Sequence, residues 1–452
     1  MRTTERSKMV FVLLIVMAMV LAACGDSSSD TTTTAAAGDD EPTATTSAPT
    51  ETTEAMTEET DAPMAEGEPI IIGSTLALTG FLSPTAAIHK VAGELFVEQL
   101  NESGGLLGRP VEWVVLDDES VPDQAAALYE RLITEDEVDL LVGPYGTGTI
   151  TAGMAVAQRY GYVFPQHTGS LTYACNYECQ FPAWPTGRYP NLTTPNLVYD
   201  ALESTGTPPE TIGFVINQVP GTVFVAQGYA DGEGDDLTGA VQIAEERGYE
   251  VVLDVQFPSN ISDWGPIAAQ VRDADPDFLY VGALGVDGPN LIAAMDALDY
   301  RPGGMFFQWP APGPLLGADA EGAMSVTAFE PHPPFTDNAK YAAVAEAFSE
   351  AAAEAGIPYT AMETQASASW AAWEILVNGV EGAGSLDNGA VCDYLVNNEI
   401  ETIFGGVDFD ADQSNYYGDL SFVKQIQDGD WWVVYPEEFA APGRSVQYSP
   451  GG

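Results

Sequence analysis

Apolar positions along most of the chain follow two alternating periods, which predicts strands that alternate with helices. Short apolar runs at 70–78, 111–117 and 139–143 are typical of buried strands. Segment 86–103, which follows the first run, carries its apolar residues at helical spacing and ends at a pair of glycines. Segment 122–136 has the same helical pattern and a proline in its first turn.

The same series begins again in the second half of the chain. A strand is predicted at 211–217, a long helical region follows it, and further strands are predicted at 249–257, 276–282 and 304–309. Parallel strands joined by helices are the usual product of such a series. The pattern therefore predicts an α/β fold with two Rossmann-like lobes, each built on a parallel sheet.

Two polar loops follow neighbouring predicted strands of the first series, at 143–149 and 165–170. In open α/β sheets, ligands bind outside the carboxyl ends of the strands. The backbone N–H groups of these loops and the hydroxyls of Thr147, Thr149 and Thr168 suit a carboxylate or a neutral polar group. No Lys follows the glycines, so the first loop is not a P-loop. The alternative is that these threonines only cap helices and close turns.

The N-terminus has the pattern of a secretory signal. Three basic residues precede an apolar run that ends in "LAAC", so we expect a signal peptide at 1–23. The four residues also resemble the lipobox of bacterial lipoproteins, in which the cysteine becomes the lipidated first residue. Cys24 is therefore predicted to carry a lipid anchor. The alternative is an uncleaved anchor with a chance cysteine.

Segment 24–68 contains no aromatic residue and no Lys or Arg. Such a segment cannot bury enough apolar surface to offset the entropy of ordering. We expect a disordered acidic tether that holds the folded body away from a membrane surface.

The formal charge of −53 makes nucleic acid and anionic membrane surfaces poor direct partners. A generally acidic surface favours solubility, and it would suit a saline habitat. The three histidines are scattered, so no metal site is predicted. Cys175 and Cys179 are close in an exported chain, which predicts a local disulfide between them. Cys392 lies on an apolar helix face and is predicted to be a buried free thiol.

Several segments together resemble one family: the "LTG" after the first strand, "NESGGLLGRPVEWVVLDD", "LLVGPYGTGT" and "WGPIAAQVRDADPDFLYVG". From about Pro69 to Pro442 the chain is similar to the branched-chain amino-acid (leucine/isoleucine/valine) binding proteins. These are type I periplasmic solute-binding proteins of ABC importers. The resemblance implies a three-crossover hinge that joins two lobes, with lobe I at 69–187 and 329–404 and lobe II at 188–328 and 405–445.

The resemblance also implies a set of site residues. The family holds a ligand carboxylate with the two polar loops, which correspond here to Thr147, Thr149, Gln166 and Thr168. At the aligned positions of the other half, amino-acid binders often place an aromatic residue and a Glu for the ligand ammonium. This chain has Leu284, Gln308 and Trp309 there. We therefore expect a small organic acid or amide with an apolar or aromatic body, walled by Phe81, Trp184 and Trp309. Ordinary core packing is the alternative role for each aromatic residue.

The function that this pattern predicts is that of a lipid-anchored receptor on the outer face of the cytoplasmic membrane. It would pass a small solute to an ABC permease powered by an ATPase, as a monomer and without a cofactor. A sensor subunit with the same fold is the alternative. An exported enzyme is not expected, because neither G-x-S-x-G nor H-E-x-x-H occurs.

Overall fold

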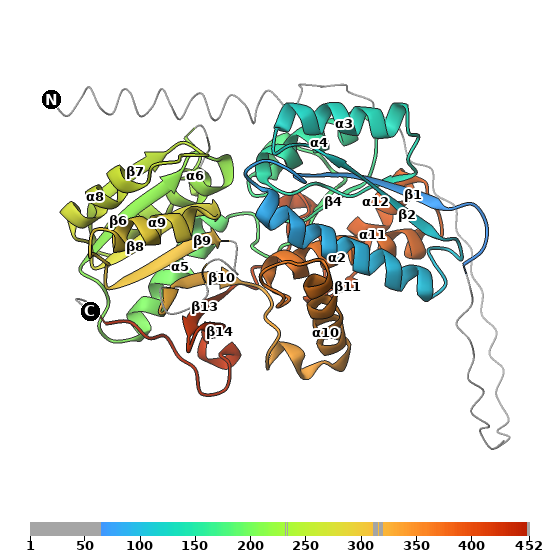
Figure 1. Ribbon diagram of the computed structural model, residues 1–452. Coiled ribbons are helices and arrows are strands. Elements are labelled where there is room, and N and C mark those ends of the chain that lie inside the picture. The colour runs from blue at the N-terminus through green and yellow to red at the C-terminus, as the bar shows by residue number, and fades with distance from the viewer. Residues whose placement is uncertain (1–64, 231, 233, 311–314, 316–319, 450–452) are drawn as a thin grey trace, which may run out of the picture.

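The computed structural model describes residues 65–230, 232, 234–310, 315 and 320–449. These residues form two lobes that lie side by side, with lobe II on the left and lobe I on the right of Figure 1. The predicted signal peptide, the predicted lipidation site Cys24 and most of the predicted tether lie outside the described residues. Among the described helices, none has both the length and the apolar character that a membrane span requires.

Lobe I contains a parallel sheet with helices on both faces. Successive residues of its first strand point to opposite faces. Ile70 and Ile72 therefore pack in the core beneath α2 and α11, and Ile71 packs on the side of α3 and α4. The strand order is β2-β1-β3, and the Gly143 amide donates to the Pro165 carbonyl (2.8 Å) to link β4 and β5 to this sheet. The strands are β1 (Ile70–Leu76), β2 (Val111–Asp117), β3 (Leu140–Leu141), β4 (Phe164–Gln166) and β5 (Gln180–Pro182).

Helix α11 of the lobe I core packs against α2 and is buried along most of its length. Trp373 of α11 contacts Phe96 of α2 and Trp113 of β2, with ring centroids 5.8 and 5.1 Å apart. The lobe I helices are α2 (Ser83–Glu102), α3 (Pro122–Thr134), α4 (Thr147–Tyr160), α10 (Ala339–Glu354), α11 (Thr364–Ala383) and α12 (Asn388–Asn397).

Lobe II is built on a seven-stranded sheet with the order β14-β13-β10-β9-β8-β6-β7. The first five strands along the chain are parallel, and the sequence predicted four of them but not β10. An antiparallel hairpin of β13 and β14 extends the edge. Its turn, Asp428 and Gly429, has positive φ at both positions (58° and 83°), which suits Asp-Gly. The strands are β6 (Thr211–Asn217), β7 (Glu250–Phe257), β8 (Phe278–Gly285), β9 (Gly304–Pro310), β10 (Met324–Thr327), β13 (Phe422–Gln427) and β14 (Asp430–Tyr435).

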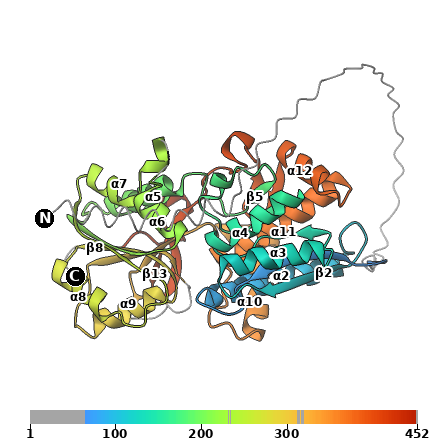
Figure 2. The same ribbon diagram turned by 90° about the horizontal axis from the view of Figure 1, so that it is seen from above.

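The helices of lobe II cover both faces of its sheet, as the view from above shows (Figure 2). The long helical region predicted after β6 is divided in two. Helix α6 ends at Gly228, whose φ of 75° stops the helix, and α7 begins at Ala240. The helices are α5 (Pro190–Ser204), α6 (Pro220–Gln227), α7 (Ala240–Glu246), α8 (Gly265–Ala274) and α9 (Asp287–Asp296).

The chain passes between the lobes three times. It leaves lobe I after β5 for α5, returns after β10 for α10, and leaves again after β12 for β13. Strand β12 (Gly405–Val407) pairs with β11 (Ile400–Thr402) beside α11. These three passes produce the two-lobed α/β architecture that the sequence predicted.

The disulfide differs from the prediction. Cys179, just before β5, is bonded to Cys392 on α12, with the Cα atoms 5.4 Å apart. The local bridge between Cys175 and Cys179 is therefore wrong, and so is the free thiol at Cys392. The short spacing was misleading because Cys175 packs toward α4, whereas Cys179 and Cys392 meet at the edge of the α11 core.

Candidate functional site

A cavity of about 170 Å³ lies between the lobes, at the carboxyl ends of their strands. Seven of the nine predicted ligand-binding residues line it. They come from loops after β1, β3, β4 and β5 in lobe I, and from β8 and β9 in lobe II. The seven are Phe81, Thr147, Thr149, Thr168, Trp184, Leu284 and Trp309.

The polar end of the cavity is the first turn of α4. Gly146, just before the helix, has φ 96°, and a Cβ there would come within 2.8 Å of Leu82. Only glycine fits this position easily. Residues Thr147, Gly148 and Thr149 line the cavity, and the first N–H groups of a helix have no intrahelical acceptor. The turn therefore presents backbone donors and the positive end of the helix dipole.

The two threonines of this turn differ in role. Thr149 donates its hydroxyl to the carbonyls of Tyr145 (2.6 Å) and Gly146 (2.8 Å), so it stabilises the turn as the alternative interpretation predicted. Thr147 Oγ1 accepts from the Ser170 amide at 3.3 Å, which leaves its own proton available. Thr168 Oγ1 is buried, and it has no hydrogen-bond partner among the described residues.

Two tryptophans form an aromatic wall of the cavity. Trp184 follows β5, where the chain leaves lobe I, and Trp309 is the next-to-last residue of β9 in lobe II. Their rings meet edge to face, with centroids 5.5 Å apart and an interplanar angle of 66°. Phe81 and Leu284 approach from opposite lobes and pack in one cluster with Tyr145. The side chains that face the ligand space are thus largely apolar.

The other two predicted residues, Gln166 and Gln308, do not line the cavity. Gln166 ends β4 and turns into its own loop, where its side chain accepts from the Gly169 amide at 2.7 Å. Gln308 precedes Trp309 on β9, and successive strand residues point to opposite faces. It is fully buried beside Tyr280 and the Gly221 carbonyl, 3.5 Å from each.

No Asp or Glu among the described residues lines the cavity. The nearest acid along the chain to Leu284 is Asp287, which accepts from Asn217 Nδ2 (2.7 Å) and from the Leu284 amide (3.2 Å). Burial raises the pKa of Asp287, and the bond from Asn217 partly opposes that rise. This carboxylate is engaged inside lobe II rather than presented to a ligand.

Three stacked rings that sequence analysis missed, His89, Tyr145 and His167, pack beside the cavity, and Tyr145 also lines it. His89 of α2 lies between Tyr145 and His167, with ring centroids 4.6 Å from each. Its Nε2 is 3.2 Å from Oε1 of Gln365, which lines the cavity at the start of α11. Burial lowers the pKa of His167 to about 3 and that of His89 well below its usual value, so both rings are neutral.

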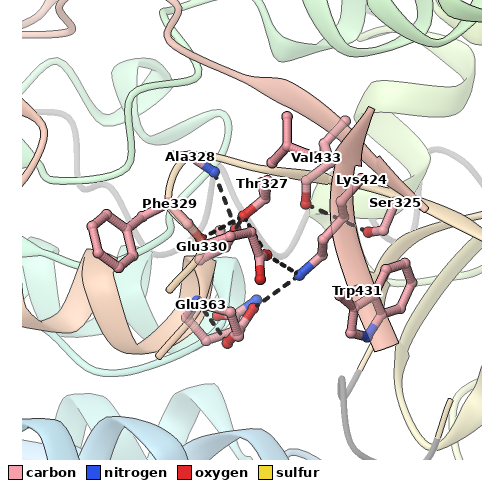
Figure 3. Close-up of polar contacts among 12 residues, drawn as sticks. Ser325, Thr327, Ala328, Phe329, Glu330, Glu363, Lys424, Trp431 and Val433 are labelled. Carbon is pink, nitrogen blue, oxygen red and sulfur yellow. Dashed lines mark hydrogen bonds and ion pairs between the residues drawn. The ribbon is translucent and has the colours of Figure 1, made fainter. Parts of the chain in front are cut away.

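A buried ion cluster lies where the chain returns from lobe II to lobe I (Figure 3). Lys424 of β13 is 2.7 Å from Glu330 and 3.6 Å from Glu363, and all three side chains are at most 3% exposed. Glu363 caps α11 by accepting from the Gln365 amide at 2.9 Å. Burial raises the pKa of Glu363 to about 7, against the opposing effect of Lys424. The cluster thus joins a strand of lobe II to the helix that carries Gln365.

A sequence relative connects this chain to solute recognition. Over 88 residues it is 39% identical to the chemotactic signal transduction system substrate-binding protein BasB of Halobacterium salinarum. That match covers 19% of this chain and only 21% of the relative. The match is therefore confined to a short shared segment, and it does not show that this chain has the activity of the whole relative.

Solved structures with the same fold cover most of the chain. LivJ of Streptococcus pneumoniae, in complex with isoleucine, has a TM-score of 0.61 at 17% identity and covers 80% of this chain and 98% of its own. An ABC transporter solute-binding protein of R. palustris, in complex with benzoate, has a TM-score of 0.64 at 19% identity and covers 80% of this chain and 95% of its own. An ABC transporter solute-binding protein of Rhodopseudomonas palustris BisB5, in complex with 3,4-dihydroxybenzoic acid, has a TM-score of 0.63 at 16% identity. The match covers 81% of this chain and 95% of that protein.

The model of one family matches nearly all of the folded part, residues 69–430, and its description is periplasmic binding protein. Proteins of this family bind solutes and are not enzymes, and the inter-lobe cavity lies where such a fold binds its ligand. The chain therefore belongs to the periplasmic binding protein family.

Proposed function

We propose that the protein is the lipid-anchored substrate-binding component of an ABC importer on the outer face of the cytoplasmic membrane. It captures a small organic acid or amide with an apolar or aromatic body and delivers it to a membrane permease. The observation that carries the proposal is the inter-lobe cavity, which has helix α4 and its N–H groups at one end and Trp184 and Trp309 at the wall.

The charge balance of the cavity argues for an acid over a zwitterion. An ammonium group buried without a carboxylate costs several kcal/mol. The described cavity-lining residues include no Asp or Glu, and Asp287 and Glu330 are held by Asn217 and Lys424. The benzoate and dihydroxybenzoate complexes of structural neighbours support an aromatic acid, whereas the isoleucine complex of LivJ supports the amino-acid alternative.

A ligand screen on the full chain tests this function. Thermal shift would first compare leucine, isoleucine, phenylalanine, benzoate, 3,4-dihydroxybenzoate and benzamide, because a ligand that binds only the native state raises its melting temperature. Calorimetry would follow on each hit. We expect micromolar binding of an aromatic acid or amide. Micromolar binding of leucine or isoleucine, with no acid or amide bound, would refute the proposed solute class.

Closure of the lobes is part of the proposal. We propose lobe I at 69–187 with 329–404, and lobe II at 188–328 with 405–445, with hinge motion at the three passes between them. Small-angle scattering should show a smaller radius of gyration with a verified ligand than without one. An unchanged radius at saturating ligand would count against closure.

The anchor is tested separately. The "LAAC" segment predicts that Cys24 is the lipidated first residue of the mature protein. Mass spectrometry of membrane-extracted protein should find a diacylated N-terminus at Cys24, and Cys24→Ser should release the protein from the membrane fraction. An intact signal peptide in wild-type protein would exclude this anchor.

A second function has one specific observation in its favour. The relative from Halobacterium salinarum is named as part of a chemotactic system. A receptor of this fold could therefore present its ligand to a signalling partner. Ligand uptake by a deletion strain separates the two functions, because loss of the transport component abolishes uptake, and loss of a sensor abolishes the swimming response.

A further inference from the structure

The side chain of Gln365 lines the cavity and contacts His89. Gln365 is the second residue of α11, and it is only 3% exposed. Its backbone amide donates to Glu363 Oε1, and its side-chain Oε1 is 3.2 Å from His89 Nε2. Within the described part of the chain, no residue accepts a hydrogen bond from its side-chain nitrogen Nε2.

The protonation of His89 decides which way this amide points. His89 is fully buried and neutral, because burial and the neighbouring His167 lower its pKa. A neutral imidazole carries one N–H, on either Nδ1 or Nε2. Nδ1 is buried without a partner among the described residues, and a buried N–H left unpaired is rarer in proteins than an unpaired acceptor. The proton therefore belongs on Nε2, which donates to Gln365 Oε1.

This donation fixes the opposite end of the amide. With Oε1 held by His89, the two N–H bonds of Gln365 Nε2 remain for a ligand in the cavity that this residue lines. We propose that Gln365, oriented by His89, is a specificity-determining residue that selects solutes with a hydrogen-bond acceptor, such as a carbonyl or nitro group, beside their carboxylate-bearing body. This inference rests on the proposed function, since it assigns one contact within that site.

Two other polar side chains at the cavity, those of Trp184 and Trp309, have the same donor bias, whereas the hydroxyl of Thr168 can donate or accept. The indole N–H groups of Trp184 and Trp309 can only donate, and they have no partner among the described residues. Ser120 is already engaged, because its hydroxyl donates to the Thr79 carbonyl and accepts from the Leu82 amide. A ligand with several acceptors and no ammonium group therefore fits the described lining best.

The test compares ligands of one shape that differ at one group. The probes are the 3- and 4-substituted acetylbenzoates, isopropylbenzoates and aminomethylbenzoates, measured by calorimetry on the full chain. The acetyl group offers an acceptor, the isopropyl group has a similar shape without one, and the aminomethyl group is a cationic donor. We expect wild-type protein to bind an acetylbenzoate about tenfold more tightly than the matching isopropylbenzoate, because the latter leaves the Gln365 N–H groups unpaired.

The variants assign the preference to Gln365. Gln365→Leu should bring the acetyl and isopropyl affinities within about twofold of each other while isopropylbenzoate binding persists. Gln365→Glu should reverse the preference toward the aminomethyl compound, which a general loss of folding could not do. A wild-type preference for the aminomethyl compound, or an acetyl preference that Gln365→Leu leaves intact, overturns the inference.

The outcomes also separate this inference from the proposed function. Binding of isopropylbenzoate without an acetyl preference retains the aromatic-acid receptor and removes the role of Gln365. Binding of no benzoate and no other acid or amide by the wild type removes both.

His89 has its own test as a positioning residue. His89→Phe preserves a ring between Tyr145 and His167 but frees the amide to rotate. The ratio of acetyl to aminomethyl affinity should then fall at least threefold, with melting temperature as the control. An equal loss of affinity for both compounds would show that His89 only supports the fold and would overturn its part in the proposal.

Discussion

Lys424 Nζ lies 2.7 Å from Glu330 Oε1, and both side chains are almost completely buried where lobe II passes into lobe I. Glu363 Oε2 lies 3.6 Å from the same ammonium, so one buried cation faces two carboxylates (Figure 3). Removal of one partner from such a cluster leaves uncompensated charge inside the protein. The cluster is therefore the place where single substitutions should be most informative about the hinge.

Lys424→Met should destabilise the folded protein by about 3 to 5 kcal/mol, because two buried carboxylates lose their only ammonium partner within the described cluster. Urea unfolding followed by tryptophan fluorescence measures the change. Lys90→Met is the matched control, since Lys90 and its partner Glu94 are 41% and 54% exposed and should contribute less than about 1 kcal/mol. Equal effects of the two substitutions would contradict this account.

Glu363 should make stability fall as the pH rises from about 4.5 to about 7. Its pKa in the folded protein is about 7, above the ordinary value of 4.5, so in this window the folded state holds a proton that the unfolded chain has lost. Unfolding then releases a proton, and a higher pH favours it. Above pH 7 the contribution of Glu363 to the free energy of unfolding no longer changes with pH, and it lowers that free energy by about 3 kcal/mol.

The measurement is the free energy of unfolding of wild type and Glu363→Gln between pH 5 and pH 8. Wild type should lose stability relative to the variant over that range. A difference between wild type and Glu363→Gln that is independent of pH would show that Glu363 does not titrate there.

Gly221→Ala should weaken ligand binding with little effect on the stability of either lobe. A Cβ at Gly221 of lobe II would lie 2.9 Å from Thr147 Oγ1 of lobe I and 3.2 Å from Trp309, so the lobes could not close to their present separation. We expect at least a tenfold loss of affinity for the ligand that the screen identifies. Gly265→Ala is the control, because a Cβ at Gly265 would contact only the side chain of Asp263, at 3.1 Å. Unchanged affinity in Gly221→Ala would mean that closure does not bring these residues together.

Replacement of both Cys179 and Cys392 by Ala should cost about 2 to 5 kcal/mol of stability, because the bond closes a long loop of chain, with a sequence separation of 213 residues. Urea unfolding of the double variant measures the cost. Ligand affinity should remain within about threefold of wild type, since neither cysteine lines the cavity. A loss of less than 1 kcal/mol would indicate that packing around α12 holds this region without the bond.

The position of the inter-lobe cavity could be predicted from the sequence because the signal was local. The loops at 143–149 and 165–170 each combine a strand end, glycines and hydroxyls, and the rule that ligands bind at the carboxyl ends of strands then brings them together. Side-chain direction was harder to predict. Gln308 is next to the cavity residue Trp309 along the chain and Gln166 is two residues from Thr168, but the strand pleat and a local bond from Gly169 turn them away.

What could not be predicted depends on contacts between distant parts of the chain. Gln365 and His89 are separated by 276 residues, and their bond follows from the packing of α11 on α2. The partner of Cys179 was equally remote, since Cys175 is four positions away along the chain and Cys392 is 213 positions away. Short spacing favoured the wrong cysteine because it contains no information on which helix lies beside β5.

The bond between Cys179 and Cys392 has a consequence for a cleaved chain. Both cysteines belong to lobe I, yet the segment between them includes β6 to β10, most of the lobe II sheet. Proteolysis in the turn between α6 and α7 would therefore leave two fragments covalently attached. Such a nicked receptor would migrate as one species on a denaturing gel without reductant, and it would separate into two only when a thiol is added.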